Sequence, residues 1–267
     1  MTVTVTAVRA AALPKTERRA ASLLATAQHD AMLKLLRGID ESLWDRPTDC
    51  AGWTVRHIVA HLAGSLADGA YLRSAMRHGI AGRRKHRDLR PLDAMNEAQI
   101  DDRRDWPAGR LIDDFERLAP KAVRARQRMP SLFRRLPLPS SMVVRGTRLG
   151  DLLDVIYIRD MWMHRVDIAR ATDRPVRADE SDADVVAQVI RDLGRRWPGP
   201  SARLTLTGLG STEAASWLLG DGEAVAVVTT DAVEFCRLLS GRPADPAYDI
   251  DGDQSVRDVL NAARVMF

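Results

Sequence analysis

Hydrophobic residues recur three or four positions apart through the first two thirds of the chain, which is the spacing of one face of an α-helix. This pattern predicts a first helix over residues 15–37, ended by Gly38. A second helix begins at Thr54, a residue type that caps helix N-termini, and runs to residue 76. Further helices are predicted over 93–128, with an interruption at Trp106-Pro107, and over 150–171. Four helices with a long loop before the last are typical of a four-helix bundle.

The pattern changes after Pro175. Residues 182–197 form one more amphipathic helix, and residues 203–207 alternate between apolar and polar side chains, as a half-buried strand does. Strands are also predicted over 214–219 and 224–229, with helices over 231–240 and 255–264. We therefore assign residues 1–175 to a mainly α-helical bundle domain and residues 176–267 to a small α+β domain.

Composition narrows the class of protein. The 267 residues carry a formal net charge of +4, and the densest basic run, residues 83–87, has no interleaved aromatic side chains. We interpret that run as a solvated loop and not as a nucleic-acid contact. No stretch reaches the roughly 18 apolar residues of a membrane span, and two distant cysteines imply no disulfide framework. We expect a cytoplasmic protein that binds neither nucleic acid nor membrane.

Two histidines and an aspartate could carry chemistry. Asp160 and His164 are four residues apart, so one helix directs both side chains the same way. Ile156 and Ile168 flank them in that row and are apolar, which places polar groups on a core-facing stripe, where they are costly unless compensated. A divalent metal is one compensator, with His61 as the third ligand and open positions left over. The spacing alone also fits a plain Asp–His pair without metal.

The remaining histidines are weaker candidates. His57 lies one helical turn before His61 and is a possible additional ligand; the alternative is that it lies nearer the surface and only titrates. Three further histidines lie in polar surroundings and are predicted to be exposed: His29, His78 and His86.

Other kinds of site have less support. Cys50 precedes the second predicted helix, where a thiol can become nucleophilic, but we interpret it as a small buried residue. There is no phosphate-binding P-loop, no complete dinucleotide-binding glycine motif and no G-x-S-x-G nucleophile motif.

The residues around His61 carry a resemblance. Residues 43–62, LWDRPTDCAGWTVRHIVAHL, resemble the mycothiol-dependent maleylpyruvate isomerase family, whose N-terminal domain is a DinB-like metal-binding four-helix bundle. Residues 93–99 and 159–168 are similar to its second and third signatures. Residues 204–208, 220–222 and 231–242 resemble its C-terminal domain, which is similar to sterol-carrier modules. The resemblance spans most of the chain in order.

The resemblance implies a divalent metal, with zinc expected, held by His61, Asp160 and His164. Characterised members carry Glu where this chain has Asp160, whose reach is one methylene shorter. They often have an acid at the position of His57. This chain therefore departs from the family at two positions near the expected metal.

The resemblance also implies mycothiol, the low-molecular-weight thiol of actinobacteria, as cosubstrate. Arg242 is the candidate for binding its acidic groups, with a surface arginine after a helix end as the alternative. Asn96 and Trp53 are further cofactor-binding candidates, although Trp53 also fits a core or wall residue.

Three functions follow for comparison. In the first, a metal-held thiolate attacks a small-molecule electrophile, which gives S-transfer or cis-trans isomerisation. In the second, the same ligands activate water for hydrolysis. In the third, the protein binds a small molecule without catalysis. We favour a mycothiol-dependent transferase or isomerase, either a monomer or a homodimer.

Overall fold

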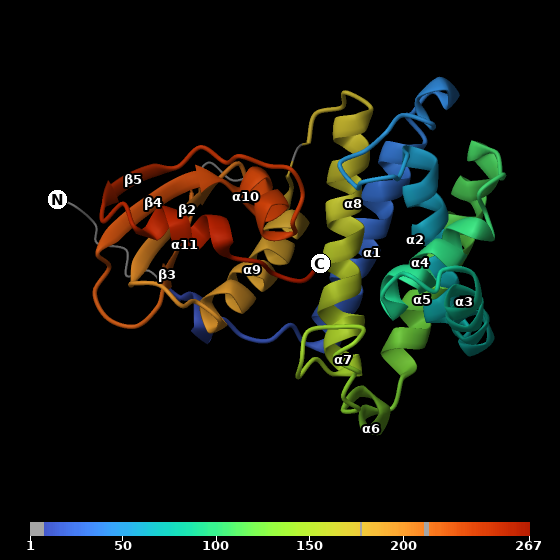
Figure 1. Cartoon of the computed structure of the whole chain (residues 1–267), viewed down its shortest axis with the longest axis horizontal. Coiled ribbons are helices and arrows are strands. Elements are labelled where there is room, and N and C mark those ends of the chain that lie inside the picture. The colour runs from blue at the N-terminus through green and yellow to red at the C-terminus, as the bar shows by residue number, and fades with distance from the viewer. Residues whose placement is uncertain (1–7, 177, 211–213) are drawn as a thin grey trace. The chain divides into compact units, whose positions relative to one another are not determined.

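The computed structural model describes residues 8–176, 178–210 and 214–267. The chain divides into two compact units, whose helices and strands are labelled in Figure 1. One unit is the helical region Glu17–Val176, and the other joins the described residues before Glu17 to those after Val176. The sequence-based division at residue 175 assigns residues 8–16 to the helical domain, whereas the structure groups them with the C-terminal unit.

The helical unit contains more long helices than the sequence pattern indicates. Its main helices are α1 (Arg18–Leu36), α2 (Val55–Ala70), α3 (Leu72–Lys85), α4 (Pro91–Asp101), α5 (Ala108–Arg128) and α8 (Tyr157–Ala171). Three short segments complete the unit: α6 (Ser131–Arg134), α7 (Leu149–Asp151) and a π-helical turn, Leu152–Ile156, that leads into α8. None of the helices in the described part of the chain has the length and apolar character that crossing a bilayer requires.

Four of these helices pack around a common core. Helix α1 contacts α5 and α8, and α2 contacts the same two helices, as Figure 1 shows. The core between them is apolar and closely packed, and it draws residues from all four helices: Met32, Leu36, Ile58, Leu62, Phe115, Leu118, Met161 and Ile168. Because burying such side chains is the main favourable term in folding, this core fixes how α2 and α8 face each other.

Helix α3 was not predicted. The sequence pattern extends one helix to residue 76, but α2 ends at Ala70, and the extended backbone of Tyr71 (φ −139°) separates it from α3. The basic run assigned to a loop largely continues α3 to Lys85, and cations in a last helical turn interact favourably with the helix dipole. Helix α3 packs on α4 through Gly82, where a Cβ atom would lie 2.6 Å from the carbonyl carbon of Ala94.

The C-terminal unit is built on a mixed five-stranded sheet of order β1-β3-β2-β4-β5. Strand β2 (Ala202–Thr207) pairs antiparallel with β3 (Ala215–Leu219) and parallel with β4 (Ala226–Asp231). The predicted alternation of β2 is confirmed, because Ala202, Leu204 and Leu206 are buried and the intervening residues are not. The edge strands β1 (Val8–Arg9) and β5 (Asp249–Gly252) were not predicted.

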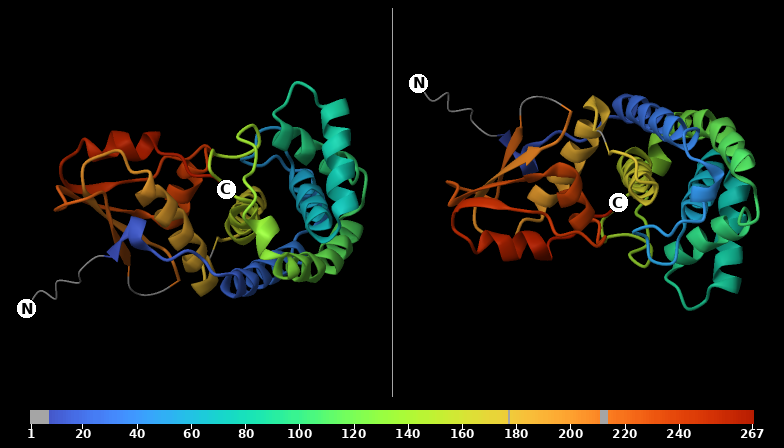
Figure 2. Two further views of the ribbon diagram at one scale, coloured as in Figure 1. Left: turned by 90° about the horizontal axis from the view of Figure 1, so that it is seen from below. Right: turned by 90° about the horizontal axis from the view of Figure 1, so that it is seen from above.

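Three helices accompany this sheet: α9 (Glu180–Arg195), α10 (Ala232–Leu239) and α11 (Val256–Ala262). Figure 2 gives two further views of them. The short 3-10 turn Ala10–Ala12 after β1 packs on α9, where a Cβ at Gly194 would clash with Ala10. This close approach, together with the parallel pairing of β1 and β3, explains why the N-terminal segment belongs to the C-terminal unit.

Candidate metal centre

Thr54 fixes the start of α2 and the position of His57. The Thr54 hydroxyl accepts a hydrogen bond from the His57 backbone N–H (3.4 Å), and the His57 Nδ1 atom accepts one from the Thr54 N–H (3.3 Å). This reciprocal arrangement is a capping box, which satisfies backbone donors at the helix start. Among the described residues, His57 belongs to neither cluster of possible metal ligands. Its side chain therefore has a capping role one turn before His61.

Asp160 and His164 lie one turn apart on α8, as their spacing predicts. The π-helical turn Leu152–Ile156 directly precedes α8, and such turns are frequent at functional sites. The flanking residues of the row, Ile156 and Ile168, are 8% and 0% exposed. The row therefore faces the core, as expected.

His61, Asp160 and His164 converge. The Oδ2 atom of Asp160 lies 3.4 Å from Nε2 of His61, and its Oδ1 atom lies 3.3 Å from Nε2 of His164. The two imidazole rings meet edge to face with their centroids 5.3 Å apart. Both histidine side chains are 5% exposed, whereas the Asp160 side chain is 24% exposed. Solvent therefore reaches the cluster at its carboxylate.

This donor set fits a divalent metal. Two atoms bonded to a tetrahedral zinc ion at about 2.0–2.1 Å lie about 3.3 Å apart, and both carboxylate-to-imidazole separations match that value. The possible ligand atoms of the three residues all lie within 4.8 Å of one another. Three protein ligands leave at least one coordination position for a small molecule. Nitrogen and oxygen donors of this kind suit zinc and other first-row divalent metals.

The outer nitrogen of each histidine faces an acceptor. Nδ1 of His61 lies 2.8 Å from Oε1 of Gln99 on α4, and Nδ1 of His164 lies 3.1 Å from Oδ2 of Asp167. Metal-binding histidines commonly donate their second N–H in this way, which fixes the ring orientation. Neither acceptor was predicted from the sequence. The spacing of His164 and Asp167 could have predicted their contact, because residues three apart on a helix share a face.

Cys50 contacts the same side of His164. Its thiol donates a hydrogen bond to Oδ2 of Asp167 (3.4 Å) and lies 3.9 Å from Nδ1 of His164. These three residues form a second cluster of possible ligand atoms, which shares His164 with the first. Cys50 is half-buried, so it is more exposed than the small buried residue that we expected from the sequence.

Electrostatics couple Asp160 to both imidazoles. Burial disfavours its charge, yet the neighbouring His164 and His61 hold the pKa of this carboxyl well below its usual range. Burial also disfavours a charge on His164, but Asp160 raises the pKa of that imidazole well above 6.5. Without a cation the pair thus holds a proton on His164, which a binding cation has to displace.

Trp53 forms a wall of the cluster, as one of the interpretations held. Its ring centroid lies 5.1 Å from that of His61 and 5.8 Å from that of His164, on which it stacks. The indole N–H donates a hydrogen bond to Oε1 of Glu97 on α4 (2.8 Å), which the sequence analysis did not single out. Asn96, the preceding residue, is half-buried on the same helix.

Arg242 lies in the C-terminal unit, after the turn that ends α10. The chain turns there at Gly241, whose φ of +83° is the left-handed conformation that ends many helices. The backbone N–H of Arg242 donates to the carbonyl of Arg237 (3.0 Å), and its side chain is half-buried.

The prediction that His29, His78 and His86 are exposed is wrong. His29 and His78 were expected to be exposed, but they are 5% and 1% exposed. His78 lies between two carboxylates, with Nδ1 2.6 Å from Asp68 and Nε2 2.8 Å from Asp102. Polar neighbours in the sequence do not reveal such burial, because the acids that stabilise His78 come from α2 and the end of α4. His86 is half-buried.

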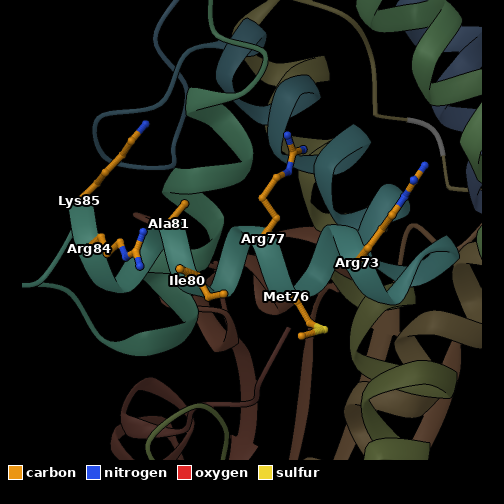
Figure 3. Close-up of a pocket in the computed structure, with 7 residues that line it drawn as sticks. All are labelled: Arg73, Met76, Arg77, Ile80, Ala81, Arg84 and Lys85. Carbon is orange, nitrogen blue, oxygen red and sulfur yellow. The ribbon is translucent and has the colours of Figure 1, made fainter.

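A surface hollow of about 560 Å³ lies along α3. Figure 3 shows its lining side chains, which come from that single helix: Arg73, Met76, Arg77, Ile80, Ala81, Arg84 and Lys85. It has no carboxylate, imidazole or thiol in its lining, so it does not compete with the His61–Asp160–His164 cluster as a metal site.

Comparisons with known proteins identify the family of the helical unit and similar folds. Residues 25–169 match the family described as the mycothiol maleylpyruvate isomerase N-terminal domain. A crystal structure of the mycothiol-dependent maleylpyruvate isomerase superposes with a TM-score of 0.57 at 16% identity, covering 92% of this chain and 97% of that one. A variant of that enzyme in which a histidine is replaced by alanine superposes with a TM-score of 0.53 at 16% identity, with the same coverage. The curated proteins include no match.

Proposed function

Because the chain belongs to the mycothiol maleylpyruvate isomerase family, we propose that it is a metal-dependent enzyme that uses the thiol of mycothiol as its nucleophile. The reaction is a cis-trans isomerisation or an S-transfer to a small electrophile. We include in this proposal that α1, α2, α5 and α8 form a DinB-like four-helix bundle around the site, and that the protein works in the cytoplasm.

The observation that carries the proposal is the convergence of His61, Asp160 and His164 from two helices distant in sequence. We assign these three residues as metal ligands. When bound, a divalent cation there would lower the pKa of a thiol enough to make it a thiolate near neutral pH, where a free thiol with a pKa near 8.5 is mostly protonated. The partly exposed Asp160 marks the side from which the thiol approaches.

The chemistry then needs no further cofactor. Addition of the thiolate sulfur to one carbon of a conjugated cis alkene turns the double bond into a single bond. Rotation about that bond and loss of the thiolate restore the alkene as the trans isomer and return the thiol unchanged. If the electrophile carries a leaving group or an epoxide, formation of the carbon–sulfur bond breaks the bond to the leaving group, which departs with the electron pair, or one C–O bond of the epoxide, whose oxygen then takes up a proton. The carbon–sulfur bond persists and the outcome is S-transfer.

We assign supporting roles to three residues outside the ligand set. The stacked ring of Trp53 excludes water from one side of the imidazoles. Asn96 lies on α4, one residue before the Glu97 that accepts the hydrogen bond of Trp53, and is our candidate for a polar contact to the thiol. Arg242 is our candidate for pairing with the acidic groups of the thiol, because a guanidinium binds carboxylates through two parallel hydrogen bonds.

The decisive experiment compares two histidines of one helix. We expect the purified parent to bind about one zinc ion per chain, as a tetrahedral three-ligand site does, and the His61→Ala variant to lose this ion while keeping its circular dichroism spectrum. His57→Ala is the matched control, since it removes a capping side chain and should leave metal binding intact. Tight metal binding by the His61→Ala variant would refute the ligand assignment.

Turnover assays separate the candidate reactions. With metal present, conversion of an activated cis alkene or an epoxide should require added thiol. Product formation without any thiol would favour the hydrolytic alternative, and no conversion combined with no metal binding would favour a non-catalytic binding protein.

A further inference from the structure

A largely buried series of hydrogen-bonded side chains runs from His61 to Asp102 at the C-terminal end of α4. Nδ1 of His61 meets Oε1 of Gln99 (2.8 Å), whose Nε2 donates to Oδ2 of Asp68 (2.7 Å). The other oxygen of Asp68 accepts from Nδ1 of His78 (2.6 Å), and Nε2 of His78 reaches Asp102 (2.8 Å). The first four side chains are almost completely buried, and that of Asp102 is 31% exposed.

The donors and acceptors in this series of hydrogen bonds have a fixed order. An ionised carboxylate only accepts hydrogen bonds, so Asp68 must face the NH₂ group of Gln99 and an N–H of His78. The Gln99 amide is thereby oriented with its oxygen toward His61, and an oxygen acceptor there requires that Nδ1 of His61 carries a proton. The lone pair of a neutral His61 is then on Nε2, the nitrogen that faces Asp160.

Gly64 allows this arrangement. It lies on α2 less than one turn after His61, and a Cβ atom there would lie 2.8 Å from Cγ of Gln99 and closer still to Cβ. Real side chains do not approach so closely, so α4 can bring Gln99 to His61 only because residue 64 has no side chain. By contrast, Gly79 on α3 has open space around the position of a Cβ.

We propose that Gln99 and Asp68 are positioning residues that keep a proton on Nδ1 of His61 and so reserve its Nε2 atom for a metal. Asp68 sets the orientation of the Gln99 amide, and Gly64 sets its distance. The purpose of the arrangement rests on the proposed metal site, but the proton position exists, and is measurable, without any metal.

The first test reads the His61 ring nitrogens by NMR in the metal-free full chain, in mildly alkaline buffer. We expect a proton on Nδ1 in the parent and in Gln99→Glu, which keeps an acceptor facing the ring. In Gln99→Leu the acceptor is lost while Asp160 still faces Nε2, so the proton should move to Nε2.

If Gln99→Leu does not fold, the isosteric Asp68→Asn variant replaces it and should give a mixture of both tautomers. An unchanged Nδ1 proton in the folded variant would overturn the proposal.

The second test measures zinc affinity by competition with a chelator. Gly64→Ala should bind zinc about 10–100-fold more weakly, as is typical when the hydrogen-bond partner of a metal-binding histidine is disturbed. Gly79→Ala should bind zinc like the parent. Parent-like affinity and an intact Nδ1 proton in Gly64→Ala would contradict the role of Gly64. If the parent binds no zinc at all, the proposed function fails, whereas the NMR result still decides the positioning role.

Discussion

The Nε2 atom of His61 lies 3.4 Å from the Oδ2 atom of Asp160, across 99 residues of sequence. The same carboxylate reaches Nε2 of His164 with its other oxygen, so one acid lies between two imidazoles. This geometry explains why the pKa values of Asp160 and His164 shift in opposite directions. It also makes Asp160 the residue whose charge holds the cluster together, with or without a cation.

Replacing that charge tests the cluster directly. Asp160→Asn should weaken metal binding by at least the roughly 10–100-fold typical of losing an outer partner, because a direct ligand contributes more. Asp160→Glu, which keeps the carboxylate, should retain the metal. Thermal unfolding with and without a chelator measures the stabilisation by bound metal. A metal present at 100 times its dissociation constant stabilises the folded state by about 2.7 kcal/mol. A chelator effect of equal size in the parent and in Asp160→Asn would count against Asp160 as a ligand.

The contact between α3 and α4 gives a second prediction. A Cβ at Gly82 would lie 2.6 Å from the backbone carbonyl carbon of Ala94. Gly82→Ala should therefore push the two helices apart and lower the free energy of unfolding by about 1–3 kcal/mol, as overpacking typically does. Gly79→Ala, on the same helix but facing open space, should raise it by up to about 1 kcal/mol, because alanine has the higher helix propensity. Urea titrations of both variants measure the difference, and equal effects of the same sign would refute the packing explanation.

The sequence predicted those parts of the structure that follow from local periodicity. The capping residue Thr54 correctly predicted the start of α2, and the spacing of Asp160 and His164 correctly predicted their common face on α8. Helix α3 was not predicted because its residues are mostly polar. Its large apolar residues Met76 and Ile80 lie on the exposed face, so no apolar stripe indicates a buried face.

Tertiary contacts decided the rest. On α1, the apolar Leu23 is 67% exposed while the polar Gln28 is fully buried, the reverse of what hydrophobic periodicity predicts. Gln99 reaches His61 only because of the glycine opposite it on α2, a relationship between two helices that periodicity does not encode. The strands β1 and β5 are too short, with two and four residues, to show alternation.

The two cysteines should differ in reactivity. Cys50 is half-buried, whereas Cys236 is 0% exposed within the C-terminal unit. A thiol reagent applied to the native protein should therefore label one thiol per chain, and two after denaturation. Cys50→Ser should abolish the native reaction. Two rapidly labelled thiols in the folded protein would contradict the burial of Cys236 in the C-terminal unit.

Acid should destabilise the helical unit through His29. Burial, together with the nearby Arg126, lowers the pKa of this imidazole to about 3, against 6.5 in an unfolded chain. Between these two pH values His29 binds a proton in the unfolded state but not in the folded state. The contribution of neutral His29 to the free energy of unfolding is therefore fully present above pH 6.5 and is lost as the pH falls toward 3. The loss approaches about 1.4 kcal/mol per pH unit, or about 2 kcal/mol between pH 7 and pH 5.

His29→Leu removes the proton-binding group while keeping an apolar side chain against Phe115. Urea titrations at the two pH values should therefore show a smaller loss in this variant than in the parent, and identical losses would mean that His29 accepts a proton in the folded protein.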